Sequence, residues 1–192
     1  MNLLGINGSP RQGGNTDILL DKALEAAEES GWETEKIILN LLDISAPQEK
    51  EYYEVNSEGL SPIKDDMQII YKKVNKCDGI ILASPIFFGS LSAQTKIMID
   101  RFQCVWVSKN LLKKEIFTQK KAGGFICAAA SHRKDFFQNA KSIVRNLFQV
   151  IRAQYKAELF CPGLEEKGEV KNHPDFLESA YELGREIISK NQ

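Results

Sequence analysis

The chain has 192 residues, of which 43% are apolar and 27% are charged, and its formal net charge is −1. This composition is typical of a soluble globular protein long enough for one domain with a full core. The near-neutral charge gives no reason to expect a nucleic-acid partner. No segment approaches the roughly 18 consecutive apolar residues of a membrane span, and the first residues lack the basic start of a signal peptide. We therefore expect a cytoplasmic protein without a membrane partner.

Five short apolar runs predict strands, and they alternate with segments in which apolar residues recur at helical spacing. The predicted strands cover residues 2–7, 33–39, 78–84, 121–129 and 153–161. The predicted helices are one that ends near Gly31 and four more over residues 65–77, 92–102, 135–151 and 173–188. Ser92 is the expected N-cap of its helix, and Pro174 lies near the start of the last one. This alternation predicts a single α/β domain over residues 1–192, with a doubly wound, five-stranded parallel sheet.

The sequence "GINGSPRQGGNT" connects the first predicted strand to the first helix. Such a loop lies at the carboxyl edge of the sheet, where open α/β sheets bind ligands and a helix N-terminus attracts anions. The loop is neither a Walker loop, because no lysine follows its last glycine, nor a G-x-G-x-x-G fingerprint. Its charged and polar side chains are Ser9, Arg11, Asn15 and Thr16. They suit a terminal phosphate monoester, although a merely flexible connection is the simpler alternative.

A second informative segment, "SPIFFGSLSAQTK", follows the third predicted strand. With the strand order 2-1-3-4-5, this segment lies beside the glycine loop. Phe87 and Phe88 offer a flat apolar surface, and the alternative is that they are core residues at a strand end. A ligand with a phosphate at one loop and a planar ring at the other fits flavin mononucleotide (FMN).

The two segments together resemble the NADPH-dependent FMN reductase and iron–sulfur flavoprotein group of flavodoxin-like proteins. The resemblance rests on "GSPRQGGNT", "DDM" and "DGIILASPIFFGSLSAQTKIMIDR", and covers residues 1–102 well and the rest loosely. It implies a flavodoxin-like fold and an FMN site. The implied phosphate ligands are Ser9, Arg11, Asn15 and Thr16, with backbone help from Gly14. The implied frame of the ribityl chain and flavin ring comprises Pro85, Ile86, Phe87, Phe88, Gly89 and Ser90.

A third flavin loop is expected after the fourth strand, at "AAASHRKD". Ala129, Ala130 and Ser131 can approach the ring through backbone groups, and His132 is a candidate for a hydrogen bond to the flavin or to a substrate. An exposed loop histidine is the plainer interpretation of His132. No side chain is assigned a catalytic role, because the flavin itself carries hydride and electrons.

The resulting hypothesis is an FMN-dependent NAD(P)H oxidoreductase that passes electrons from a nicotinamide to a quinone, a free flavin or another small acceptor. One alternative is a flavodoxin-type electron carrier that serves protein partners, although such carriers are usually strongly acidic. The other is a protein of this fold that binds a ligand without turnover. The apolar residues Val105, Trp106 and Val107, outside any clear strand or helix, suggest a homodimer or homotetramer, or ordinary packing under a loop.

Iron–sulfur members of the resembled group carry a cysteine motif ahead of "DDM". Aligned from Asp65, its four positions fall on Glu49, Tyr52, Val55 and Ser61, and residues 42–64 contain neither cysteine nor histidine. The cysteines of the chain (Cys77, Cys104, Cys127 and Cys161) are dispersed, without a C-x-x-C pair. We therefore predict buried, reduced thiols, no metal site and no iron–sulfur cluster.

Overall fold

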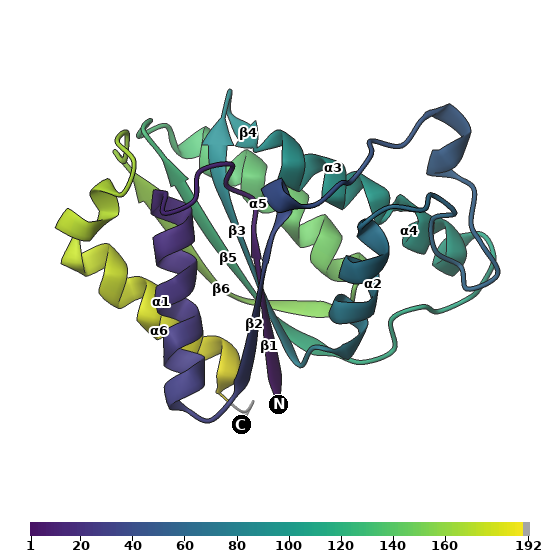
Figure 1. Ribbon diagram of the computed structural model, residues 1–192, viewed down its shortest axis with the longest axis horizontal. Coiled ribbons are helices and arrows are strands. Elements are labelled where there is room, and N and C mark those ends of the chain that lie inside the picture. Colours follow the sequence, from purple (N-terminus) through teal and green to yellow (C-terminus); the bar gives the residue numbers. More distant parts are fainter. Residues whose placement is uncertain (190–192) are drawn as a thin grey trace.

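The computed structural model describes residues 1–189 and has a central sheet covered by helices on both faces (Figure 1). Its strands are β1 (Asn2–Asn7), β2 (Glu33–Ile38), β3 (Gly79–Phe87), β4 (Ser90–Leu91), β5 (Lys121–Ala129) and β6 (Ala153–Pro162). Its helices are α1 (Asn15–Glu29), α2 (Met67–Lys76), α3 (Ala93–Arg101), α4 (Gln103–Asn110), α5 (Lys134–Val150) and α6 (Pro174–Ile188). Three short 3₁₀ helices complete the list: η1 (Leu39–Leu41), η2 (Glu49–Tyr52) and η3 (Glu169–Asn172).

The sheet order β2-β1-β3-β5-β6 confirms the predicted flavodoxin-like topology. These five strands pair in parallel, and the short β4 pairs antiparallel with the end of β3. Because every parallel strand runs in the same direction, the loops that follow β1, β3, β5 and β6 emerge at one edge of the sheet. The N-terminus lies at the opposite edge (Figure 1).

Helices α1 and α6 cover one face of the sheet, and α2, α3, α4 and α5 cover the other (Figure 1). Strand side chains alternate between these two layers: Leu4 belongs to the core under α2–α5, whereas Leu3 belongs to the core under α1 and α6. Burial on both faces explains why the inner strands β1, β3 and β5 are mostly apolar, whereas the edge strands β2 and β6 carry polar residues and are only partly buried. At Gly184 of α6, an added Cβ would lie 2.1 Å from the backbone oxygen of Ala23, so the two helices pack backbone to backbone.

Local signals in the sequence set the helix ends. The hydroxyl of Ser92 accepts a hydrogen bond from the backbone N–H of Thr95, which confirms the expected N-cap of α3. Pro174 occupies the first turn of α6, where its missing N–H costs nothing. Gly31 follows α1 with a φ of +80°, the left-handed conformation that ends many helices.

Two segments differ from the sequence-based expectation. Residues 103–117 were expected to lack regular structure, but α4 begins at Gln103 and buries Cys104, Val105, Val107 and Ser108. Packing against the core overrides the low helix propensity of the two valines. Strand β3 was expected to end at Ser84 but continues to Phe87, because a tight turn brings β4 back to pair with it.

The segment between η1 and α2 projects away from the sheet on the side of α2 and α4 (Figure 1). A buried ion pair between Arg101 of α3 and Asp65 anchors it, with side chains only 1% and 5% exposed. The Arg101 guanidinium also donates to the backbone oxygen of Ser45 at 3.0 Å and to the hydroxyl of Ser61 at 3.2 Å. Within residues 1–189, no helix is long and apolar enough to cross a membrane.

Candidate functional site

A cavity of about 250 Å³ lies at the carboxyl edge of the sheet, between the loops that follow β1, β3, β5 and β6. Many of the residues predicted from the sequence line it: Ser9, Arg11, Gly14, Asn15, Thr16, Pro85, Ile86, Phe87, Ala129 and Ala130. The remaining lining residues were not predicted: Ala128, Leu164, Glu165 and Lys167. The topology therefore brings the two sequence motifs together, as expected for adjacent strand ends.

The glycine loop is braced from within by Asp17, a residue that the sequence analysis did not single out. Its carboxylate accepts hydrogen bonds from the side-chain amide of Asn7 at 2.7 Å and from the backbone N–H of Gly13 at 2.8 Å. The ammonium group of Lys36 lies 2.7 Å from the same carboxylate. Asn7 in turn accepts from the backbone N–H of Ser9 at 2.8 Å. This network fixes the curvature of the loop around the start of α1.

The start of α1 retains the features of an anion site. No side chain caps its first turn, so the backbone N–H groups there stay free. These groups and the partial positive charge of the helix start lie at the cavity, which Gly14, Asn15 and Thr16 help to line. Within residues 1–189, the guanidinium of Arg11 and the hydroxyl of Thr16 form no hydrogen bond or ion pair, which leaves both available to a ligand. The hydroxyl of Ser9 accepts from the backbone N–H of Arg11 at 3.2 Å and so shapes the turn.

Asn15 lines the cavity but its side chain is already engaged. Its amide donates to the backbone oxygen of Glu166 at 2.8 Å, and its oxygen accepts from the backbone N–H of Val170 at 3.1 Å. Asn15 thereby holds the loop that follows β6 against the glycine loop. A direct contact between Asn15 and a phosphate stays a prediction from the sequence.

The loop after β6 adds a cation that the sequence analysis missed. A Cβ added at Gly13 would lie 3.8 Å from Cε of Lys167, so this side chain reaches the end of the cavity that the glycine loop forms. The loop is also fixed by the backbone N–H of Leu164, which donates to the backbone oxygen of Ala129 at 3.0 Å. The sequence did offer one signal for this loop. It follows a predicted strand, and all loops that follow strands of a parallel sheet lie at the same edge of that sheet.

The segment after β3 forms a hairpin whose base lines the cavity and whose tip does not. Phe88 and Gly89, with φ values of +50° and +74°, form a two-residue turn between β3 and β4. Pro85, Ile86 and Phe87 line the cavity, whereas Phe88, Gly89 and Ser90 lie outside its lining. The first half of the motif therefore lines the cavity, and the expectation that the whole motif frames a flavin stays a prediction.

Hydroxyl groups clamp this hairpin to the glycine loop. The hydroxyl of Ser92 donates to the backbone oxygen of Gly8 at 2.6 Å, and its backbone N–H donates to the hydroxyl of Ser84 at 3.1 Å. Thr95 lies so close that a Cβ added at Gly8 would be 1.8 Å from its hydroxyl oxygen. The small residue types in both motifs are therefore needed to bring the two loops together.

The loop after β5 contributes Ala128, Ala129 and Ala130 to the cavity. Ser131 and His132 do not line it. The hydroxyl of Ser131 accepts from the backbone N–H of Arg133 at 3.2 Å. The His132 ring is exposed and lies against Gly163, where an added Cβ would be 2.9 Å from its Cε1. In this structure His132 is a loop contact outside the cavity.

The cavity is thus polarised from one end to the other. Arg11, Lys167 and the start of α1 make its polar end, and the rest of the lining, apart from Glu165, consists of apolar side chains from the loops after β3, β5 and β6. This distribution fits a ligand with a phosphate on a flexible chain and a planar ring. Within residues 1–189, no group of three or more His, Cys, Asp or Glu residues is placed to hold a metal ion.

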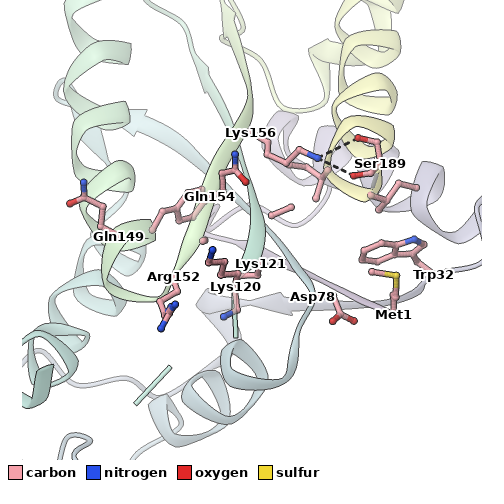
Figure 2. Close-up of a pocket in the computed structure, with 15 residues that line it drawn as sticks. Met1, Trp32, Asp78, Lys120, Lys121, Gln149, Arg152, Gln154, Lys156 and Ser189 are labelled. Carbon is pink, nitrogen blue, oxygen red and sulfur yellow. Dashed lines mark hydrogen bonds between the residues drawn. The ribbon is translucent and has the colours of Figure 1, made fainter. Parts of the chain in front are cut away.

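A larger hollow of about 540 Å³ lies at the opposite edge of the sheet, lined by Lys120, Lys121, Arg152 and Lys156 among others (Figure 2). Of these four cations, Lys121, Lys156 and Arg152 have acceptors within the protein, whereas within residues 1–189 the Lys120 ammonium forms no hydrogen bond or ion pair. The ammonium of Lys121 donates to the backbone oxygens of Gln119 and Ile151, and that of Lys156 donates to Ser189 (Figure 2). Arg152 pairs with Glu115 at 3.2 Å. The hollow differs from the cavity at the carboxyl edge in its place in the fold, because its lining comes mainly from residues near the starts of the strands and not from the loops that follow them.

Comparison with known proteins agrees with this geometry. Residues 1–159 match the family model described as NADPH-dependent FMN reductase. An iron–sulfur flavoprotein of Methanocaldococcus jannaschii is 33% identical over 97% of this chain and 95% of its own length. Among solved structures, a flavone reductase superposes on this chain with a TM-score of 0.73 at 20% sequence identity. The superposition covers 97% of this chain and 62% of the flavone reductase chain.

An NAD(P)H:quinone oxidoreductase from Methanothermobacter marburgensis superposes with a TM-score of 0.66 at 17% identity, over 100% of this chain and 96% of that one. At these low identities the structural matches establish the flavodoxin-like fold. The family model covers most of the chain and establishes the family. This chain belongs to the NADPH-dependent FMN reductase family, and it is an FMN-dependent NAD(P)H oxidoreductase.

Proposed function

We propose that the chain folds as one domain that binds one FMN in the cavity at the carboxyl edge and passes electrons from NAD(P)H to a small acceptor. The observation that carries the proposal is the polarity of the cavity: unpaired cationic and hydroxyl groups at one end and an apolar wall at the other. Arg11, Thr16 and the N–H groups of α1 bind the phosphate, with Lys167 as a second positive charge. Ser9 and Gly14 shape the turn around it.

The flavin ring rests on the apolar wall. Pro85, Ile86 and Phe87, together with Ala128, Ala129 and Ala130, would hold the flavin ring. When bound, FMN supplies hydride and electron transfer, so the protein needs only to hold and orient the ring. The titratable side chains of the cavity wall are Arg11, Glu165 and Lys167, none of which is required as a nucleophile or general base.

Anaerobic reduction tests this function directly. The purified protein is loaded with FMN, and its absorption near 450 nm (roughly the band of oxidised flavins) is followed after NADH or NADPH is added. We expect rapid bleaching by at least one nicotinamide and reoxidation by a quinone or by free flavin. Bleaching by dithionite alone would instead support the electron-carrier function. No flavin binding would contradict both proposals.

We further propose that this chain carries no iron–sulfur cluster, although several relatives are named iron–sulfur flavoproteins. Residues 42–64 contain no cysteine, and all four thiols are buried, at the end of α2, in α4, in β5 and in β6. An iron–sulfur cluster normally needs four thiolates or, in some centres, histidines. Anaerobic purification followed by iron and acid-labile sulfide analysis tests the proposal, and stoichiometric amounts of both would overturn it.

The chain is also proposed to act as a homodimer or homotetramer in the cytoplasm, with no nucleic-acid partner. The surface around Trp106, which is 41% exposed, supports self-association. A groove of about 360 Å³ beside it is lined by Tyr52, Phe102 and Leu147 among others. Light scattering after size-exclusion chromatography measures the molecular mass, and a monomer at micromolar concentration would contradict this part of the proposal.

A further inference from the structure

Phe88 combines two features that each oppose folding stability. Its φ of +50° lies in the left-handed region, which residues with a Cβ rarely adopt. Its side chain is fully exposed, so its phenyl ring is not stabilised by burial. Glycine or asparagine at this turn position would avoid both costs. A strained, exposed aromatic residue at the rim of a cofactor site indicates a role outside the fold itself.

The hairpin that carries Phe88 is held firmly in place. The side-chain amide of Asn139 donates to the backbone oxygen of Gly89 at 2.8 Å. The ring of Phe136 lies beneath Gly89, where an added Cβ would be 3.0 Å from two ring carbons. The guanidinium of Arg133 covers that ring, 4.4 Å from its centroid. These contacts brace the hairpin from α5, so the ring of Phe88 is presented at a defined position.

The position of Phe88 separates it from the cofactor wall. Phe87, one residue earlier, lines the cavity and is 42% exposed, whereas Phe88 lies beyond the lining. Consecutive residues of a strand point to opposite sides, and the left-handed turn redirects the second ring into solvent. The two rings therefore serve different sides of the hairpin: Phe87 faces the proposed flavin site, and Phe88 faces the solution from which a second substrate arrives.

We infer that Phe88 is a specificity-determining residue that stacks on planar aromatic electron acceptors, such as quinones, as they approach the reduced flavin. The inference rests on the proposed function. In the overall reaction, NAD(P)H gives two electrons and one proton as a hydride, the solvent gives a second proton, and the quinone becomes a hydroquinone. Phe88 takes no part in the electron transfer. Its ring favours flat acceptors through offset stacking, and a small inorganic acceptor gains nothing from it.

The test compares two acceptors in FMN-loaded variants: the naphthoquinone menadione and the non-aromatic ion ferricyanide. In Phe88→Gly, we expect the ratio of the KM for menadione to the KM for ferricyanide to rise roughly 3- to 10-fold, the range expected from loss of one stacked pair. Phe88→Tyr keeps an aromatic ring and should restore the wild-type ratio. Leu112→Gly removes another exposed apolar side chain, 56% exposed, outside the cavity lining and serves as the control.

Stability supplies a second readout. Because glycine relieves the left-handed strain, Phe88→Gly should raise Tm by roughly 2–4 °C while acceptor selectivity falls. An unchanged KM ratio would overturn the inference. So would a parallel loss of FMN affinity, which would make Phe88 a cofactor ligand, or a smaller oligomer, which would make it a subunit contact. Failure of NAD(P)H to bleach the flavin of the unsubstituted protein would instead contradict the proposed function.

Discussion

Two unpaired cations at the phosphate end of the cavity allow a direct test of how FMN is held. Arg11 and Lys167 come from loops after different strands, yet both line the cavity. Within residues 1–189, neither side chain forms a hydrogen bond or ion pair. We therefore expect Arg11→Ala and Lys167→Ala to leave Tm nearly unchanged, because surface substitutions without partners alter stability by about 0.5 kcal/mol or less.

The expected cost to binding is larger for Arg11 than for Lys167. A charge-assisted hydrogen bond contributes about 1.5–3 kcal/mol, so Arg11→Ala should weaken FMN binding about 10- to 150-fold. Lys167 acts across solvent as a point charge, and its loss should cost about 0.2–1 kcal/mol, the usual range for an exposed pair. The phosphate carries roughly −1.5 to −2 charges near neutral pH, so the two cations together nearly neutralise it.

Fluorescence titration of the apoprotein with FMN and with riboflavin measures these effects separately from ring binding. Riboflavin lacks the phosphate, so its affinity should be the same in the wild type and in both variants. Lys171→Ala removes an exposed lysine of the same region that does not line the cavity and should change neither affinity. Equal losses for FMN and riboflavin, or no loss for FMN, would refute the assignment of the phosphate to this end.

Three other predictions concern stability and are checked by urea unfolding. Gly184→Ala places a Cβ 2.1 Å from the backbone oxygen of Ala23 and should cost about 2 kcal/mol, whereas Ser179→Ala on the exposed face of α6 should cost little. Arg101→Met leaves the buried carboxylate of Asp65 unpaired and should cost about 3–5 kcal/mol, part of which Asp65→Asn should restore in the double variant. Burial raises the pKa of the Cys77 thiol to about 11 and that of Cys161 to about 12, so the folded state keeps protons that the unfolded state releases above about pH 8.5. Stability should therefore be fully present below that pH and fall by about 2 kcal/mol per buried thiol by pH 10, and a flat profile between pH 8 and 10 would contradict this reasoning.

The positions of the strands and helices were predictable because their signals are local, whereas the order of the sheet came from the resemblance to flavodoxin-like proteins. The inner strands are short, mostly apolar runs, and Ser92, Gly31 and Pro174 mark helix ends by their own chemistry. The meeting of the glycine loop and the segment after β3 then followed from topology alone. Parallel strands bring their carboxyl ends to one edge whatever the details of the loops.

The missed features depend on contacts between distant residues. Lys167 reaches the cavity because two distant residues hold its loop: Asn15, at the start of α1, binds the backbone at Glu166 and Val170, and Ala129 accepts from Leu164. The turn at Phe88 needs a positive φ that its residue type disfavours, so no propensity predicts it. Helix α4 forms because Cys104 and Ser108 find a place in the core, and the sequence "CVWVS" contains no helix signal that is strong without that core.

The same long-range contacts bear on how the site binds its cofactor. Asp17 braces the glycine loop, Asn15 ties it to the loop after β6, and Ser92 ties it to the hairpin after β3. Each bond joins groups of the chain itself, so the cavity wall does not depend on ligand atoms for its shape. A wall fixed in this way loses little conformational entropy when FMN binds, which leaves more of the interaction energy for affinity. In the proposed function, Arg11, Thr16 and Lys167 are the groups that gain a partner when FMN binds, and the paired residues fix the shape of the cavity wall around them.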